Sequence, residues 1–213
     1  MKDKQELLSV ELLISTECAH CPIMLNHFSK IVKEGLISEL KVLNVAMNPE
    51  IAVEREIRSV PWARVNEFIL EGSYTYEELK TWIDHANNNS GEKEYFLLML
   101  NNQQLEKAIN FTQNNLSRLD LLINLLADLQ TTMAVRIGIS AIFEDLSEKG
   151  KLESALPNLI KLLDSKHEII RIDAVYFLSL LDYKKVERHL KLLRNDRNQE
   201  IKDIVSEFFQ KNI

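Results

Sequence analysis

The chain has 213 residues, of which 46% are hydrophobic and 27% are charged, and its formal net charge is −6. This composition is that of an ordinary globular protein with room for one large domain or two small ones. The first 90 residues carry 9 Lys and Arg against 14 Asp and Glu, a net charge of −5, and the remainder carries 17 against 18, a net charge of −1. Neither part is the basic field that follows a phosphate backbone, so we expect no nucleic-acid partner.

The sequence has no run of about 18 apolar residues and no secretory h-region after its start, so we expect neither a membrane partner nor export. Its five glycines and four prolines are few, which favours long helices over an all-β sandwich. In a cytoplasmic protein, two cysteines are typical of redox or metal chemistry rather than of a structural bridge. We therefore predict a cytoplasmic protein.

In chain order, the first predicted element is a buried strand over residues 8–14, which is followed by Cys18-Ala19-His20-Cys21. These are the only two cysteines of the chain, and an amphipathic helix is predicted to open at Cys18. The free N–H groups and the dipole of a helix N-terminus lower a thiol pKa from about 8.5 into a range of roughly 3.5–7.5. The pair is thus predicted to be redox-active, and the alternative is two ordinary half-buried cysteines that happen to have this spacing.

Beyond these cysteines, strand and helix patterns alternate up to residue 86. The pattern predicts a strand at 40–46, a helix from Pro49 to about residue 58, two short strands at 63–65 and 68–71, and a helix at 77–86. Asn48 is expected to cap the first of these helices, and Thr75 and Glu78 form a capping box before the second. Asn66 and Glu67 are the predicted tight turn between the two short strands.

This β-α-β-α-β-β-α order resembles the minimal thioredoxin fold, of glutaredoxin size, over about residues 7–86. The resemblance rests on the Cys-x-x-Cys sequence after the first strand, on Val60-Pro61 before the third, and on Gly72 leading into the final helix. The segment 16–22 is also similar to the N-terminal domains of alkyl hydroperoxide reductase flavoproteins and to archaeal glutaredoxin-like disulfide oxidoreductases. The resemblance implies thiol–disulfide exchange with a protein disulfide or dithiol, with a redox-active disulfide and no further cofactor or metal.

The resemblance also implies roles for single residues. Cys18 would be the attacking nucleophile and Cys21 the resolving thiol, while Pro61 would be the cis-proline that faces their disulfide. The backbone of Val60 would pair with an extended substrate segment. His20 stands before the second cysteine, as at the isomerase and oxidant end of the family, where a protonated imidazole would stabilise the thiolate and make the disulfide more oxidising. The alternative is a solvent-facing histidine with little effect.

Three positions depart from the family pattern. Leu12 stands where thioredoxins carry a buried acid, and strand alternation turns the adjacent Glu11 the other way. Glu17 replaces an aromatic residue, and its negative charge would raise the pKa of the Cys18 thiol. Trp62 follows the proline and is predicted to bind substrate, with a place in the core as the alternative. The Thr and the paired glycines that bind glutathione in glutaredoxins are absent, so we do not expect glutathione dependence.

The polar segment 87–91 separates a predicted thioredoxin-like domain, residues 1–88, from a predicted all-α domain, residues 92–213. Helices are predicted at about 93–100, 103–112, 116–129, 133–146, 152–163, 168–181, 186–193 and 199–210. Ser165 and Glu168 have the spacing of a second capping box.

An internal repeat runs through this second region. Val135-Arg136, Ile170-Arg171 and Ile201-Lys202 each follow a Leu-Leu-containing segment, at separations of 35 and 31 residues. The pattern resembles HEAT-like repeats over about residues 116–210, which implies a short α-solenoid. The resemblance also implies that the four residues of this pattern that could link neighbouring repeats are structural. They are Arg136, Arg171, Asp173 and Lys202.

These features leave three hypotheses for the function. The first is a thiol–disulfide oxidoreductase whose helical domain binds or selects a protein partner and which a reductase recycles. The second is a non-catalytic, redox-sensitive interaction module in which the solenoid is the working surface. The third is metal or cluster binding, but Cys18, Cys21 and His20 are too few ligands for a closed tetrahedral site in one chain.

Overall fold

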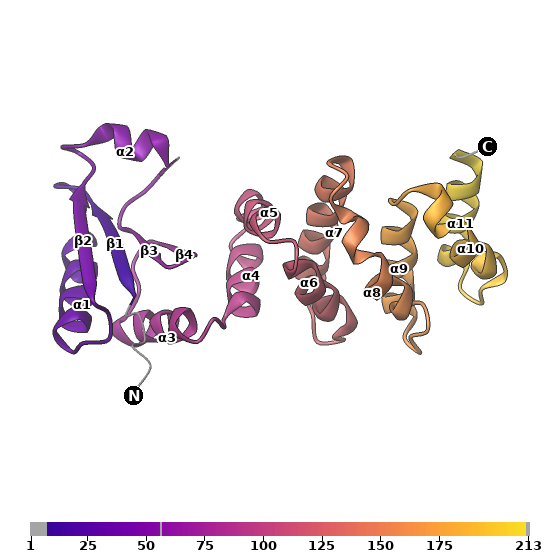
Figure 1. The fold of residues 1–213 in the computed structure, drawn as a ribbon, viewed down its shortest axis with the longest axis horizontal. Helices are drawn as coiled ribbons and strands as arrows, with labels where there is room; N and C mark the ends of the chain where they lie inside the picture. The colour runs from indigo at the N-terminus through magenta and orange to yellow at the C-terminus, as the bar shows by residue number, and fades with distance from the viewer. Residues whose placement is uncertain (1–7, 56, 212–213) are drawn as a thin grey trace, which may run out of the picture. The chain divides into compact units, whose positions relative to one another are not determined.

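The computed structural model describes residues 8–55 and 57–211 (Figure 1). The chain divides into two compact units, Met1–Tyr95 and Phe96–Ile213. The division falls a few residues after the predicted linker because Tyr95 is tied to the first unit. Its hydroxyl accepts a hydrogen bond from the Ile69 N–H at 2.9 Å and lies 3.2 Å from the Ile69 carbonyl oxygen. Among the described residues, no helix is long and apolar enough to cross a membrane.

The first unit contains a four-stranded sheet with the strand order β2-β1-β3-β4. Its strands and helices follow one another as β1 (Ser9–Ile14), α1 (Cys21–Lys33), β2 (Glu39–Asn44), α2 (Pro49–Glu54), β3 (Trp62–Val65), β4 (Phe68–Glu71) and α3 (Tyr76–Asn87). β1 pairs with β2 in parallel and with β3 antiparallel, and β3 pairs antiparallel with β4. The predicted β-α-β-α-β-β-α order is therefore confirmed.

Burial explains why β1 lies inside this sheet. Val10, Leu12 and Leu13 are all fully buried, so both faces of the strand are covered. A strand with two covered faces needs a hydrogen-bonded neighbour on each edge, and β2 and β3 supply them. In α1, Met24 and Phe28 are buried at a spacing of one helical turn, which places the apolar stripe of the helix against the core.

The ends of α1 and α3 follow from short sequence signals. Gly35 has φ +75° directly after α1, and its N–H donates to the Val32 carbonyl at 3.0 Å, a helix stop that favours glycine. At the start of α3, Thr75 and Glu78 form the predicted capping box in both directions. Asn66 has φ +53° in the predicted turn between β3 and β4.

The helix predicted from Pro49 to about residue 58 begins where predicted but ends early, because α2 spans only Pro49–Glu54. Asn48 precedes it, but its side chain makes no capping bond and instead donates to the Asn44 carbonyl at 2.9 Å. α2 also contributes no buried residue. A helix without a side-chain cap or a buried face has little to extend it beyond its second turn.

Glu11 forms a charge cluster on β1. Its carboxylate pairs with Arg55, at the end of α2, and with Lys41 of β2, whose Nζ lies 3.6 Å away. Burial raises the pKa of Glu11, but the hydrogen bond and charge of Arg55, with Lys41 and Arg64 nearby, outweigh it and leave the pKa below its usual value. The cluster therefore ties the end of α2 to the sheet.

The lowered pKa of Glu11 predicts a contribution to stability that depends on pH. The contribution is present above the unfolded-state pKa of about 4.3 and is lost as the pH falls through the lower folded-state pKa. Glu11→Gln is expected to lower the urea midpoint of the first unit at neutral pH, with a smaller difference from the wild type in acid. Tryptophan fluorescence at both pH values measures this, since Trp62 and Trp82 are the only tryptophans of the chain. Equal losses from Glu11→Gln at both pH values, or an equal effect of the exposed control Asp84→Asn, would contradict it.

The second unit is helical throughout its described residues. Its elements are α4 (Glu92–Asn101, which begins in the first unit), α5 (Leu105–Asn114), α6 (Arg118–Ala127), α7 (Met133–Glu148), η1 (Leu152–Ala155), α8 (Leu156–Leu162), α9 (Glu168–Ser179), α10 (Tyr183–Leu192), η2 (Leu193–Asn195) and α11 (Gln199–Lys211). α9 contacts α7, α8, α10 and α11. The core of the second unit is apolar and aromatic. The rings of Phe143 in α7 and Phe177 in α9 pack edge to face there, with their centroids 4.8 Å apart.

Arg136 of α7 links three segments of this unit. The side chain is 5% exposed, donates to the carbonyls of Leu126 at 2.9 Å and Asp128 at 3.0 Å, and pairs with Asp173 of α9. Burial raises the pKa of Asp173, while the Arg136 charge acts in the opposite direction. The residue thus joins the end of α6, the start of α7 and the side of α9.

The predicted capping box at Ser165 and Glu168 is wrong. His167 occupies the N-cap position of α9, and its side chain makes no hydrogen bond to the helix N-terminus. Ser165 instead accepts the His167 N–H through its own hydroxyl at 3.3 Å, a local turn that ends before the helix begins.

Candidate active site

The two cysteines lie in the turn between β1 and α1 and form a disulfide. Cys18 is half-buried, whereas Cys21 is only 2% exposed. The prediction that α1 opens at Cys18 is wrong, since its first residue is Cys21 and its N-cap is His20. The residues before His20 form turns, and one of these brings the Cys18 sulfur to the Cys21 N–H. The more exposed cysteine therefore lies shortly before the helix, and the buried one is the first residue of the helix.

The start of α1 is directed at the Cys18 sulfur. The Cys21 N–H donates to Cys18 Sγ at 3.0 Å. Pro22, in the first turn, has no N–H of its own to compete for that position. In the reduced protein the same N–H would stabilise a Cys18 thiolate, because a hydrogen bond to the charged form lowers a thiol pKa.

The segment of Val60 and Pro61, which is 42 residues from Cys18 in the sequence, lies beside the disulfide. The Val60–Pro61 peptide bond is cis, as the family resemblance implies. The Val60 carbonyl oxygen lies 3.6 Å from Cys18 Sγ. The sulfur carries no proton in the disulfide, so this is a contact, whereas a reduced thiol could donate to that oxygen. The Pro61 carbonyl accepts the Gly72 N–H at 2.9 Å, which ties the proline to the segment after β4.

Val60 is half-buried and Pro61 is buried. Among the residues that the structure describes, none accepts a hydrogen bond from the Val60 N–H. This N–H, beside the disulfide, is the type of group with which an extended substrate segment pairs. The substrate-binding role of Val60 stays a prediction that this geometry supports.

The burial of Trp62 does not fit its predicted substrate-binding role. The side chain is 2% exposed, and the Arg64 guanidinium lies 5.3 Å from its ring centroid. Trp62 begins β3 and pairs with Leu13 of β1. The burial favours the alternative of a core residue, because a ring this covered has almost no surface to offer a substrate.

Asn44 is a supporting residue that the sequence reasoning missed. Its side-chain Nδ2 donates to Thr16 Oγ1 at 3.1 Å, and its Oδ1 accepts the Ala46 N–H at 3.0 Å. It therefore links the end of β2 to the turn that carries Cys18. An asparagine at the end of a predicted parallel strand is the signal that could have indicated this role, since parallel strands end at the same edge of a sheet.

Two residues with ionisable side chains stand near Cys18 along the chain. Glu17 and His20 are both exposed. Removing the positive form of His20 would weaken the stabilisation of the thiolate, whereas removing the Glu17 charge would strengthen it. The two residues therefore form a matched pair for testing how local charge sets the redox potential.

We expect His20→Gln to make the reduction potential of the disulfide more negative and Glu17→Gln to make it less negative. Each shift is expected to reach up to about 30 mV, which is equivalent to roughly one unit in the pKa of the Cys18 thiol. Equilibration with glutathione redox buffers, read by thiol alkylation, measures both. Shifts of the same sign would contradict this account of the charges.

No group of three or more His, Cys, Asp or Glu residues in the described parts of the chain is arranged to hold a metal ion. The site thus consists of a half-buried cysteine, a buried cysteine joined to it by a disulfide, and the Val60 backbone beside the Cys18 sulfur.

Comparison with known proteins agrees with this geometry. Residues 8–84 match the family model described as a thioredoxin domain. A search of curated proteins finds no match for the chain. The chain therefore carries an N-terminal thioredoxin domain with a Cys18–Cys21 disulfide, followed by a helical region that lies outside the family match.

Proposed function

We propose that this protein is a thiol–disulfide oxidoreductase that acts on protein substrates through Cys18 and Cys21. The observation that carries the proposal is the unequal burial of the two cysteines, together with the N–H that the helix directs at Cys18. An attacking sulfur must reach its substrate, and a resolving sulfur is better kept from it.

The exchange takes place in two steps. The Cys18 thiolate attacks one sulfur of a substrate disulfide, the substrate S–S bond breaks, and its other sulfur leaves as a thiolate. Cys21 then loses its proton and attacks Cys18 Sγ, which forms the Cys18–Cys21 disulfide and releases the second substrate sulfur. The substrate gains two electrons and, from solvent, two protons. Run in reverse, the same steps oxidise a substrate dithiol.

The Val60–Pro61 segment would hold the substrate during these steps. The Val60 N–H, which donates to none of the described residues, and the Val60 carbonyl beside Cys18 supply the donor and acceptor with which an extended chain aligns. A reductase partner would return the disulfide to the dithiol when the protein acts as a reductant.

We also propose that the helical region is a short solenoid of HEAT-like repeats that binds or selects the protein partner. Its support is the repeated Val/Ile-Arg sequence together with the contacts of two of its arginines. Arg136 pairs with Asp173 of α9, and the Arg171 guanidinium lies 3.5 Å from Asp196, before α11. Such links between neighbouring helix pairs are expected in repeat architectures, whose extended surfaces commonly bind proteins.

Disulfide trapping tests the proposed function. Cys21→Ser, which lacks the resolving thiol, is expected to accumulate mixed disulfides with its substrates in the cytosol of its own cell. Non-reducing electrophoresis and mass spectrometry would identify these substrates, with the Cys18→Ser, Cys21→Ser double variant as the control. Partners that are captured equally by the double variant would overturn the enzymatic proposal and favour a non-catalytic interaction module.

A further inference from the structure

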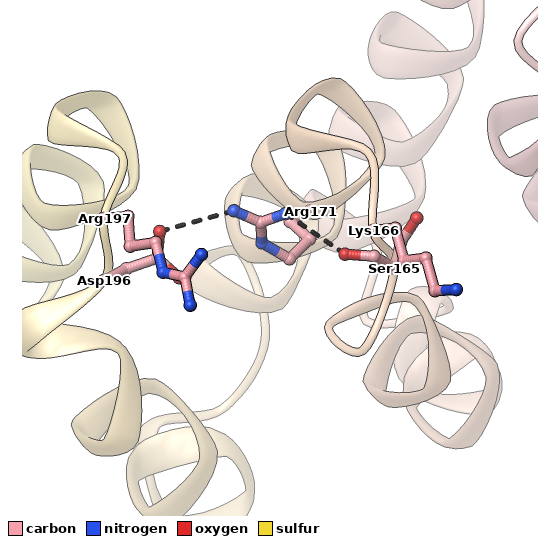
Figure 2. A pocket seen from close by; sticks show the side chains of 5 residues that line it. All are labelled: Ser165, Lys166, Arg171, Asp196 and Arg197. Carbon is pink, nitrogen blue, oxygen red and sulfur yellow. Dashed lines mark hydrogen bonds and ion pairs between the residues drawn. The ribbon is translucent and has the colours of Figure 1, made fainter.

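A pocket of about 400 Å³ lies within the second unit (Figure 2). It lies between the first turn of α9, with the segment before it, and the segment before α11. Five residues line it, namely Ser165, Lys166, Arg171, Asp196 and Arg197. Three of these five carry a positive charge and one carries a negative charge, so the lining is cationic. The pocket takes no part in the chemistry proposed for the disulfide.

Arg171 forms the inner wall of this pocket, and its partners do not use all of its donors. A guanidinium has five N–H donors. Arg171 donates to the Ser165 carbonyl at 3.1 Å, and its carboxylate neighbour Asp196 lies at 3.5 Å, longer than a good hydrogen bond. Its side chain is 15% exposed. The guanidinium is thus held in place while part of it remains open to a ligand.

The corresponding arginine of the preceding helix pair is an internal comparison. Arg136 is also the fourth residue of its helix, but two carbonyls and Asp173 engage it, and it is only 5% exposed. The segment before α7, residues 128–132, contains no Lys or Arg, whereas Lys166 and Arg197 stand in the segments beside Arg171. The positive charge is therefore concentrated at the second of two similar places.

Arg197 is the second wall of the pocket. Figure 2 shows its guanidinium and that of Arg171 on neighbouring sides of the pocket, while Lys166 extends away from Arg171 in this view. In the described parts of the chain, neither Lys166 nor Arg197 forms a side-chain hydrogen bond or ion pair. Arg197 is therefore available to a ligand without breaking an existing contact.

We propose that this pocket binds a phosphate group. Guanidinium groups bind phosphate oxygens through paired N–H donors. A phosphate monoester carries about −1.5 to −2 charges at pH 7, so it attracts the guanidiniums of Arg171 and Arg197 more strongly than a carboxylate with its single charge does. The group could belong to a small molecule or to a phosphorylated side chain of a protein.

Calorimetric titration of the full chain tests the proposal, with inorganic phosphate, a phosphoserine peptide and its unphosphorylated form as probes at constant ionic strength. Phosphate and the phosphopeptide are expected to bind, and the unphosphorylated peptide is not. Equal affinities for phosphate and the phosphopeptide indicate that the pocket recognises the phosphate alone, and tighter binding of the phosphopeptide indicates a protein source. The absence of binding by both phosphate-containing probes would overturn the proposal.

Matched variants locate the binding. Arg197→Gln is expected to weaken phosphate binding about tenfold, the loss of a charge-assisted contact. Lys191→Gln removes the same charge from an exposed position on α10 and is expected to leave the affinity within about twofold, as screened charges outside the pocket do. Equal weakening by both variants would mean general charge attraction and would overturn the pocket as the site. The urea midpoint of each variant without phosphate shows whether it folds.

Discussion

Cys18→Ser is expected to reduce thiol–disulfide exchange to the rate measured without protein. The thiolate is the attacking group in this reaction, and a serine hydroxyl cannot replace it at neutral pH. Cys18 is also the sulfur that accepts the Cys21 N–H and lies beside Val60. Reduction of a fluorescent disulfide-linked peptide, followed over time with dithiothreitol as the electron source, measures the loss.

Cys21→Ser is the matched variant, because it leaves the attacking sulfur in place. Pre-reduced and assayed without dithiothreitol, which would itself cleave the mixed disulfide, it is expected to complete a single round of attack and to stop at the mixed disulfide. Fluorescence then rises once, and the half of the peptide that is bound to Cys18 is not released. The wild-type rate should rise with pH as the Cys18 thiol ionises and then level off. Exchange by Cys18→Ser at the wild-type rate would exclude Cys18 as the nucleophile, and equal behaviour of the two variants would exclude the division of roles between the sulfurs.

Arg136→Met is expected to destabilise the helical unit by about 3–5 kcal/mol. Removal of one partner of a buried ion pair leaves the other charge and its acceptors without compensation, which typically costs this much. Here the Leu126 and Asp128 carbonyls and the Asp173 carboxylate would all lose their donor. Loss of the arginine is also expected to raise the pKa of Asp173 further, since the Arg136 charge now lowers it.

Urea unfolding followed by far-ultraviolet circular dichroism measures this loss, because most helices of the chain lie in the second unit. Tryptophan fluorescence follows the first unit separately. Arg171→Met is the matched control, and its cost is expected to be smaller, because Arg171 has one carbonyl partner and a longer approach to its carboxylate. If Arg136→Met lowers the free energy of unfolding no more than Arg171→Met does, the buried contacts of Arg136 do not account for the stability of the helical unit.

Several features of the first unit could be predicted from the sequence because they depend on neighbouring residues. The apolar run of β1, the capping box of Thr75 and Glu78, and the turn at Asn66 each rest on signals within a few residues. The start of α1 could not be placed in this way. The Cys21 N–H bonds to the Cys18 sulfur, and the helix begins after that turn instead of at the first cysteine.

Burial was harder to predict than secondary structure. Trp62 has the same hydrophobic side chain whether it lines a groove or fills the core, and only its 2% exposure in the folded protein shows that it is covered. Glu11 was predicted to turn away from the position of the family's buried acid. Its partner Arg55 is 44 residues distant, so no local pattern could indicate the pair.

The two cysteines with their spacing, the order of the strands and helices, and the change to a helical chain after the linker can all be read from the amino-acid sequence. Folding is what buries Cys21 more deeply than Cys18, brings the Val60 carbonyl to 3.6 Å from Cys18, and leaves Arg171 more exposed than Arg136. The difference lies in the range of the interactions involved. Helix and turn signals act between residues a few positions apart, whereas burial and the approach of Val60 to Cys18 depend on how segments distant in the chain pack together.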